Sequence, residues 1–121
     1  MILDHRRWLD SDGRAGARLE GDDLNLTGYD LDFVDLSRAR LPGADFGTSS
    51  LRGARFVEAE LENSGYGYCA LEGANFSRAK LTWASFVSAD HTRACFEGAE
   101  TEHTQWNEDA YRTPRLPDPQ P

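Results

Sequence analysis

The sequence predicts a single all-β solenoid, and three observations predict it. A large residue, apolar with few exceptions, stands at every fifth position from Leu36 to Trp106. A small residue such as Ala44 or Ala74 stands two positions before each of them, and this register holds for fifteen units between residues 34 and 108. Neither the helical period of 3.6 nor the strand period of 2 matches a strict five. A short repeat sustained this long is typical of coils that bury their faces against one another.

The large residues, which we name the central positions, predict the core. From Phe46 onward they alternate between an aromatic residue and Leu. In a coil with an even number of sides, aromatic residues would therefore stack on aromatic residues and Leu on Leu. His91 and Thr101 replace Leu in the last units. The predicted core ladder consists of Leu36, Leu41, Phe46, Leu51, Phe56, Leu61, Tyr66, Leu71, Phe76, Leu81, Phe86, Phe96 and Trp106.

At these residues the chain resembles the pentapeptide-repeat family. The repeated pattern is plainest in Ala44-Asp45-Phe46-Gly47-Thr48, Ala54-Arg55-Phe56-Val57-Glu58 and Ala74-Asn75-Phe76-Ser77-Arg78. The resemblance covers about two thirds of the chain and implies a right-handed quadrilateral β-helix of about four to five coils, with four units per coil. Residues twenty apart would then stack, which places Phe46, Tyr66, Phe86 and Trp106 in one ladder and Phe56, Phe76 and Phe96 in the opposite one.

Three segments are expected along the chain. Residues 1–16 form a capping helix and an entry, because Ile2, His5 and Leu9 share one helical face and an open solenoid end requires a cap. The segment His5-Arg6-Arg7-Trp8-Leu9 resembles the cap found before the repeats in this family. Residues 17–112 hold the repeats, with a two-residue insertion near 27–33, since Leu19 and Leu24 are out of step with Leu31. Residues 113–121 are a proline-rich tail, expected to be extended or disordered because proline cannot join a ladder of hydrogen bonds.

Chemistry-bearing residues do not form a catalytic pattern. His5 belongs to the cap, His91 to the core and His103 to an outer corner, and no Ser-His-Asp pairing, phosphate loop or zinc spacing is present. Cys69 falls at a small inward position and Cys95 at an outward one, so we expect two free thiols. We therefore predict no enzymatic activity, no catalytic residue, no metal and no cofactor. No apolar run has transmembrane length and the N-terminus lacks a signal-peptide core, so a cytoplasmic protein without membrane association is expected.

The net charge of −8, with 13 basic against 21 acidic residues, argues against direct nucleic-acid binding. The family resemblance implies an opposite activity, in which the rod imitates DNA and binds DNA gyrase or another type II topoisomerase. The candidate acidic surface does not form a continuous stripe on any side, which weakens that alternative. It consists of Asp30, Asp32, Glu60, Glu62, Glu72, Asp90, Glu100 and Glu102.

One side of the predicted helix, centred on Phe46, Tyr66, Phe86 and Trp106, carries few charges. Its outward residues are small, and Tyr68, Trp83 and Val87 form a candidate interaction surface, because exposed aromatic side chains dominate binding energy at interfaces. The alternative interpretation is that single exposed aromatic residues are ordinary. We expect a non-enzymatic protein-binding module with an unknown protein partner, present as a monomer or weak homodimer. A toxin immunity or adaptor protein is a third alternative.

Overall fold

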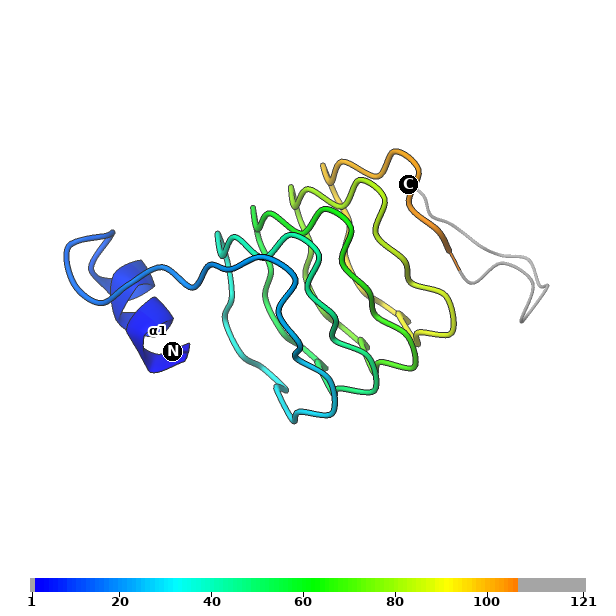
Figure 1. The fold of residues 1–121 in the computed structure, drawn as a ribbon, viewed down its shortest axis with the longest axis horizontal. Coiled ribbons are helices and arrows are strands. Elements are labelled where there is room, and N and C mark those ends of the chain that lie inside the picture. Colours follow the sequence, from blue (N-terminus) through cyan, green and yellow to red (C-terminus); the bar gives the residue numbers. More distant parts are fainter. Residues whose placement is uncertain (1, 107–121) are drawn as a thin grey trace.

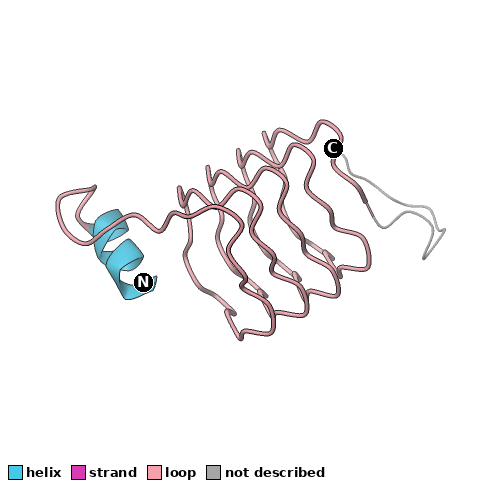
Figure 2. Ribbon diagram, in the orientation of Figure 1, coloured by secondary structure: helices cyan, strands magenta, loops and turns pink. Residues whose placement is uncertain are grey.

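The computed structural model describes residues 2–106, which form a stack of coils with one helix at the N-terminal end (Figure 1). Parallel β-bridges join residues twenty apart at every fifth position, from Glu20 with Arg40 to Ser85 with Gln105. Each coil therefore has four bridged segments. Because the bridges are isolated rather than joined into strands, helix α1, Ile2–Asp10, is the one regular element drawn in the described part of the chain (Figure 2).

A tight turn separates each bridged segment from the next. In Leu41-Pro42-Gly43-Ala44, the Ala44 N–H donates to the Leu41 carbonyl at 3.2 Å and Gly43 has a φ of +74°. These are the features of a type II turn, which favours proline at its second position and glycine at its third. The third position has a positive φ in unit after unit, including units where the residue is not glycine.

The pattern of backbone hydrogen bonds explains why Asp or Asn often precedes the central residue. Phe46 N–H donates to Gly65 O and Thr48 N–H donates to Gly67 O in the next coil, both at 2.8 Å. The intervening Gly47 N–H has no such backbone partner and donates to Asp45 Oδ1 at 2.9 Å. Buried and half-buried N–H groups need a partner, and a short side chain two residues earlier supplies it. The same bond recurs at Asn25, Asp30, Asp35, Asn75 and Asp90.

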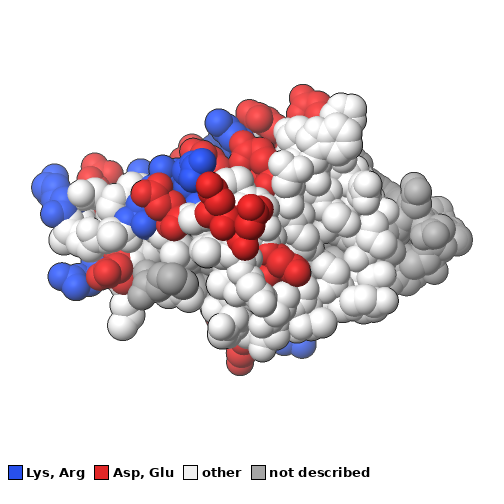
Figure 3. Space-filling view, in the orientation of Figure 1, with Lys and Arg blue, Asp and Glu red and all other residues white. Residues whose placement is uncertain are grey.

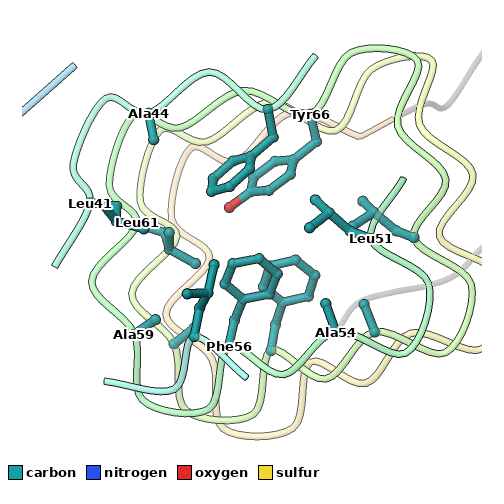
Figure 4. Close-up of a cluster of buried hydrophobic side chains, with 14 of the residues drawn as sticks. Leu41, Ala44, Leu51, Ala54, Phe56, Ala59, Leu61 and Tyr66 are labelled. Atoms are coloured by element: carbon teal, nitrogen blue, oxygen red, sulfur yellow. The ribbon is translucent and has the colours of Figure 1, made fainter. Parts of the chain in front are cut away.

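The interior holds two columns of stacked aromatic rings, separated by leucines (Figure 4). Tyr66 stacks on Phe46 at 5.3 Å and on Phe86 at 4.5 Å, and Phe86 stacks on Trp106 at 5.0 Å. In the opposite column, Phe76 stacks on Phe56 at 4.8 Å and on Phe96 at 5.2 Å. The central residues from Leu36 to Phe86 are buried, whereas Phe96 and Trp106, in the last described coil, are partly buried. Like side chains therefore stack at a spacing of twenty residues.

The small inward positions are buried beside these columns. Ala39, Ala44, Ala54, Ala74 and Ala84 have at most 1% of their surface exposed. Where this position is polar, the side chain bonds to backbone: Ser49 Oγ donates to Leu26 O at 2.6 Å, and Cys69 Sγ donates to Phe46 O at 2.8 Å. A buried polar group without such a bond would cost stability.

The two-residue insertion expected near residues 27–33 is not present. Bridges from Glu20, Asn25 and Asp30 keep the register of all later ones. Leu24 instead occupies a small position, while Gly21 occupies the central position of the same turn, and a Cβ added to Gly21 would lie 3.0 Å from Leu24 Cδ1. Large and small residues have exchanged places, so the apolar pattern shifts although the backbone register does not.

Helix α1 caps part of the N-terminal end through His5. The His5 side chain is buried; its Nδ1 accepts from Leu19 N at 2.8 Å, so its Nε2 carries the proton and donates to Ser37 O at 2.9 Å. The Trp8 ring stacks on His5 at 5.5 Å, and the Arg38 guanidinium lies 4.9 Å from the Trp8 ring. His5 thus supplies partners to backbone groups at an edge that has no preceding coil.

The cap leaves an apolar pocket of about 140 Å³ between α1 and the first coil. Tyr29 at this end remains half exposed, with 54% of its surface open to solvent. The pocket is lined by Ile2, Leu19, Leu26, Tyr29, Leu31 and Leu36. The predicted tail, 113–121, and the end of the predicted repeat region at residue 112 lie outside the described residues.

Candidate interaction surface

The candidate surface is the side of the stack between two rows of turns, and we name it the uncharged face. Its middle is formed by the outward bridge residues Asp45, Gly65, Ser85 and Gln105, which pair in succession from coil to coil. One border is the turn row of Asn63, Trp83 and His103, and the other holds Thr48, Gly67, Tyr68, Val87 and Ser88. Within this set, Asp45 is the one carboxylate. Figure 3 shows one face of the molecule, where most charged side chains gather toward the N-terminal end and the upper edge.

Trp83 stands on the first border as an exposed ring held on one side. It stacks on His103 with 4.3 Å between the ring centroids and 12° between the planes. Both residues occupy the same turn position in consecutive coils, because they are twenty residues apart. Despite this contact, 57% of the Trp83 surface is exposed. More than half of the Trp83 surface therefore remains available to a partner.

Tyr68 and Val87 stand on the opposite border. Tyr68 is 76% exposed and Val87 is 43% exposed. Gly67 lies directly before Tyr68, and a Cβ added there would meet nothing within 4 Å. The space beside the Tyr68 backbone is therefore open to solvent or to a partner.

The backbone at both aromatic residues is unfavourable for a bulky side chain. The φ angle is +57° at Tyr68 and +65° at Trp83, in the left-handed region where glycine is preferred and aromatic residues are uncommon. An L-residue there costs roughly 1–2 kcal/mol. Neither ring is part of the core, so neither repays this cost by burial on folding. Phe33 shares the conformation and is 77% exposed, but its ring lies over Gly53, where a Cβ would approach it to 2.6 Å.

The candidate acidic residues are not part of this set, although Glu62 and Glu102 lie next to Asn63 and His103 in the same turns. Several of the others are paired with arginines in other coils. Arg52 bonds Asp32 and Glu72, each at 3.2 Å, and the Ser50 hydroxyl and Arg52 hold the pKa of Asp32 below its ordinary value. Glu60 pairs with Arg18 at 3.2 Å and with Arg40 at 3.7 Å. Acidic and basic side chains thus alternate from coil to coil at a spacing of twenty residues. They form ladders of ion pairs rather than a continuous stripe of carboxylates.

The remaining acidic candidates have separate surroundings. Asp30 and Asp90 accept the N–H of the residue two positions later, and the Thr92 hydroxyl lowers the pKa of Asp90. Glu102 accepts from Thr82 Oγ1 at 3.5 Å. Glu62 and Glu100 have no side-chain partner among residues 2–106. These eight carboxylates therefore do not form one site.

The other titratable groups serve the fold. Burial lowers the pKa of His91, whose ring meets Phe96 and Trp106 edge-on in the last described coil. Burial raises the pKa of the Cys69 thiol to about 12. In the described chain, no group of three or more His, Cys, Asp or Glu is placed to hold a metal ion. The one helix between residues 2 and 106 is too short and too polar to span a bilayer.

Sequence reasoning missed two features of the site and core. The first is the stacking of His103 on Trp83, which the size pattern does not predict, although the spacing of twenty residues between them carries that signal. The second is the hydrogen bond between Ser64 and Tyr66, which a pattern of large and small residues does not predict.

Comparisons with known proteins agree with this geometry. A family model described as pentapeptide repeats, in eight copies, matches residues 30–64 and 68–100. A pentapeptide repeat protein from the Arabidopsis thaliana thylakoid lumen is 35% identical with a TM-score of 0.64, over 65% of this chain and 55% of that one. HetL, involved in heterocyst differentiation regulation in the cyanobacterium Nostoc sp. PCC 7120, is 30% identical with a TM-score of 0.65, over 67% of this chain and 38% of that one.

A third neighbour shares the fold over its whole length. This pentapeptide repeat protein from the cyanobacterium Cyanothece 51142 is 21% identical with a TM-score of 0.51, over 88% of this chain and 99% of that one. The chain spans about half the length of the Arabidopsis neighbour and less of HetL. No curated protein matches the chain in sequence.

Proposed function

Because this chain belongs to the pentapeptide-repeat family, we propose that its coils form the right-handed quadrilateral β-helix of that family and present the uncharged face to a protein partner. The proposal has two parts, a scaffold and a surface. The scaffold is supported by parallel bridges between residues twenty apart and by neighbours that are pentapeptide repeat proteins. The surface is argued from this chain's own residues.

The observation that carries the function is the pair of exposed aromatic rings on opposite borders of the uncharged face. Trp83 and Tyr68 are 57% and 76% exposed in backbone conformations that disfavour them. Aromatic anchors on a surface with little charge are the composition of an interface core, where charged residues are depleted. Low local charge also reduces the desolvation cost of covering the face. The face therefore has the properties of a protein-binding surface.

We infer a binding role rather than a catalytic one. Proteins of this family are generally non-enzymatic structural or binding modules. The buried groups that could do chemistry are engaged in the fold, since His5 bonds Leu19 and Ser37 and Cys69 bonds Phe46. Function then resides in the outer surface of the stack.

The test is capture of a partner from the source organism by wild-type protein and by Trp83→Ala/Tyr68→Ala. Any captured protein is identified, purified and titrated directly against both variants. We expect the double variant to keep its melting temperature and lose binding. Phe33→Ala removes an equally exposed aromatic residue from another side of the stack and is expected to bind as wild type. Equal binding by all three proteins would remove the uncharged face from consideration.

A further inference from the structure

We propose that the chain's own C-terminal segment, residues 113–121, docks in cis on the uncharged face and competes with the partner. This inference rests on the proposed function, because it uses the same face. It commits to one occupant, the proline-rich segment Thr113-Pro114-Arg115-Leu116-Pro117-Asp118-Pro119-Gln120-Pro121.

The composition of the segment matches the chemistry of the face. Four of the chain's five prolines lie within these nine residues, and Pro114 and Pro117 form a Pro-x-x-Pro spacing. Such segments favour the polyproline II conformation, in which little conformational entropy is lost on binding. They are recognised by grooves lined with aromatic side chains. Trp83 and Tyr68 are exposed aromatic residues of this kind on the two borders of the face.

The chain leaves the described structure at the edge of this same face. Gln105 is its last outward bridge residue, and Trp106 stacks on Phe86 directly behind it. Six residues, 107–112, separate Trp106 from Thr113. Extended, they reach about 20 Å at roughly 3.3 Å per residue. Gly65, beside Tyr68, is two coils from Gln105, about 10 Å at the usual strand spacing. The linker is therefore long enough to place the segment along the face.

Electrostatics also favour this occupant. Arg115 and Asp118 cancel within the segment, so it brings no net charge to a face on which Asp45 is the one carboxylate among the described residues that define it. Docking then requires little desolvation of charge. A short linker gives an effective concentration in the millimolar range, so a contact too weak to hold a separate peptide is occupied when tethered. A protein partner would have to displace the segment.

The test compares full-length wild type with full-length Pro114→Ala/Pro117→Ala by amide and indole NMR. Loss of docking is expected to shift the Gly65 and Gly67 amides and the Trp83 indole N–H, while the Phe33 amide stays unchanged. Gln120→Ala, which keeps both prolines, is the matched control and is expected to resemble wild type. A melting curve for each variant confirms that the coil stack is intact.

Two results would overturn the proposal. If the Gly65 and Gly67 amide signals and the Trp83 indole signal are the same in wild type and in Pro114→Ala/Pro117→Ala, the segment does not dock on the uncharged face. If the differences vanish on dilution, the occupant is the segment of a second copy rather than the same chain. Neither result tests the binding of a protein partner, which is measured separately by capture. A partner that binds wild type and not Trp83→Ala/Tyr68→Ala supports the proposed binding surface even if the segment does not dock. With docking, capture by the double proline variant exceeds capture by wild type.

Discussion

The hydroxyl groups of Tyr66 and Ser64 lie 3.0 Å apart inside the coil stack, where both side chains are buried. Ser64 Oγ also lies 2.7 Å from the Leu61 carbonyl. Since a serine hydroxyl has one proton and the shorter contact takes it, the Tyr66 hydroxyl donates to Ser64. Burial raises the pKa of Tyr66 far above its ordinary value, so the phenol stays protonated. The aromatic column thus accommodates a phenol without an unpaired polar group.

Removing the Ser64 hydroxyl is expected to cost more than removing the Tyr66 hydroxyl. Ser64→Ala leaves a buried phenol without a partner, a loss of about 1–3 kcal/mol, whereas Tyr66→Phe leaves Ser64 bonded to Leu61. Urea denaturation of both variants and of Ser64→Ala/Tyr66→Phe measures the coupling. The double variant should be more stable than Ser64→Ala. Strictly additive losses would show that the two hydroxyls do not interact.

Enlarging a small inward residue should overpack the core. Ala74 has none of its surface exposed, so Ala74→Leu is expected to lower stability by ~1–3 kcal/mol and the melting temperature with it. Ala70→Leu makes the same change at a half-buried outward position and is the control. Thermal melts of the two variants give the comparison, and an unchanged melt for Ala74→Leu would contradict the inward assignment.

The cap depends on one neutral imidazole. His5→Ala leaves Leu19 N–H and Ser37 C=O without their partner, at a cost of ~1–3 kcal/mol for each buried group. Burial, which outweighs the bond to Ser37, lowers the pKa of His5. Its contribution to stability is therefore complete above the ordinary pKa of about 6.5 and is lost as the pH falls from there through the lowered pKa of the folded state.

Stability measured from pH 8 to pH 5 checks this dependence. His91 also has a lowered pKa, so His5→Gln is expected to reduce the slope below pH 6.5 without abolishing it. A His5 ring proton signal that titrates at or above pH 6.5 in the folded protein would contradict the cap geometry.

The two cysteines should differ in reactivity. Cys69 is buried, bonded to Phe46 O, and its raised pKa of about 12 leaves almost no thiolate at pH 8. Cys95 is half-buried, with Ser77 Oγ 3.3 Å away. Alkylation under native conditions, read by peptide mass, should modify Cys95 first and Cys69 only after unfolding. Equal rates in the native protein would mean that the coil opens at Cys69.

The charge ladders predict that the chain does not act as a DNA mimic. Asp32, Glu60 and Glu72 are paired with arginines, so a continuous field of carboxylates is not available to a basic DNA-binding surface. Gyrase supercoiling, with and without a quinolone, is expected to be unaffected by added protein. Inhibition or drug protection at micromolar protein would reverse this expectation and direct mutagenesis to Glu62, Glu100 and Glu102.

The solenoid and its columns followed from the sequence because the repeat is strictly local. Each unit of five needs one large residue, one small residue and a turn, and these needs are visible as spacing alone. The alternation of aromatic residues and Leu gave an even number of sides, and the twenty-residue stacking of Phe46, Tyr66 and Phe86 has the same period. Spacing could not reveal the arrangement of the first turn. There Gly21 occupies the position of the large residue and Leu24 that of the small one, while the backbone register continues unchanged.

By itself the sequence determined the family, the period, the core columns and the small number of charges around Tyr68 and Trp83. Only the tertiary structure decided which side chains meet across coils. Arg52 neutralises Asp32 and Glu72, Trp83 stacks on His103, and His5 bonds both Leu19 and Ser37. The repeat pattern determines whether a side chain points into the core or outward, because this direction depends only on its position within the unit of five. Pairing depends on the distance and orientation of groups that are 14 to 32 residues apart in these examples, and these are set only when the coils are stacked.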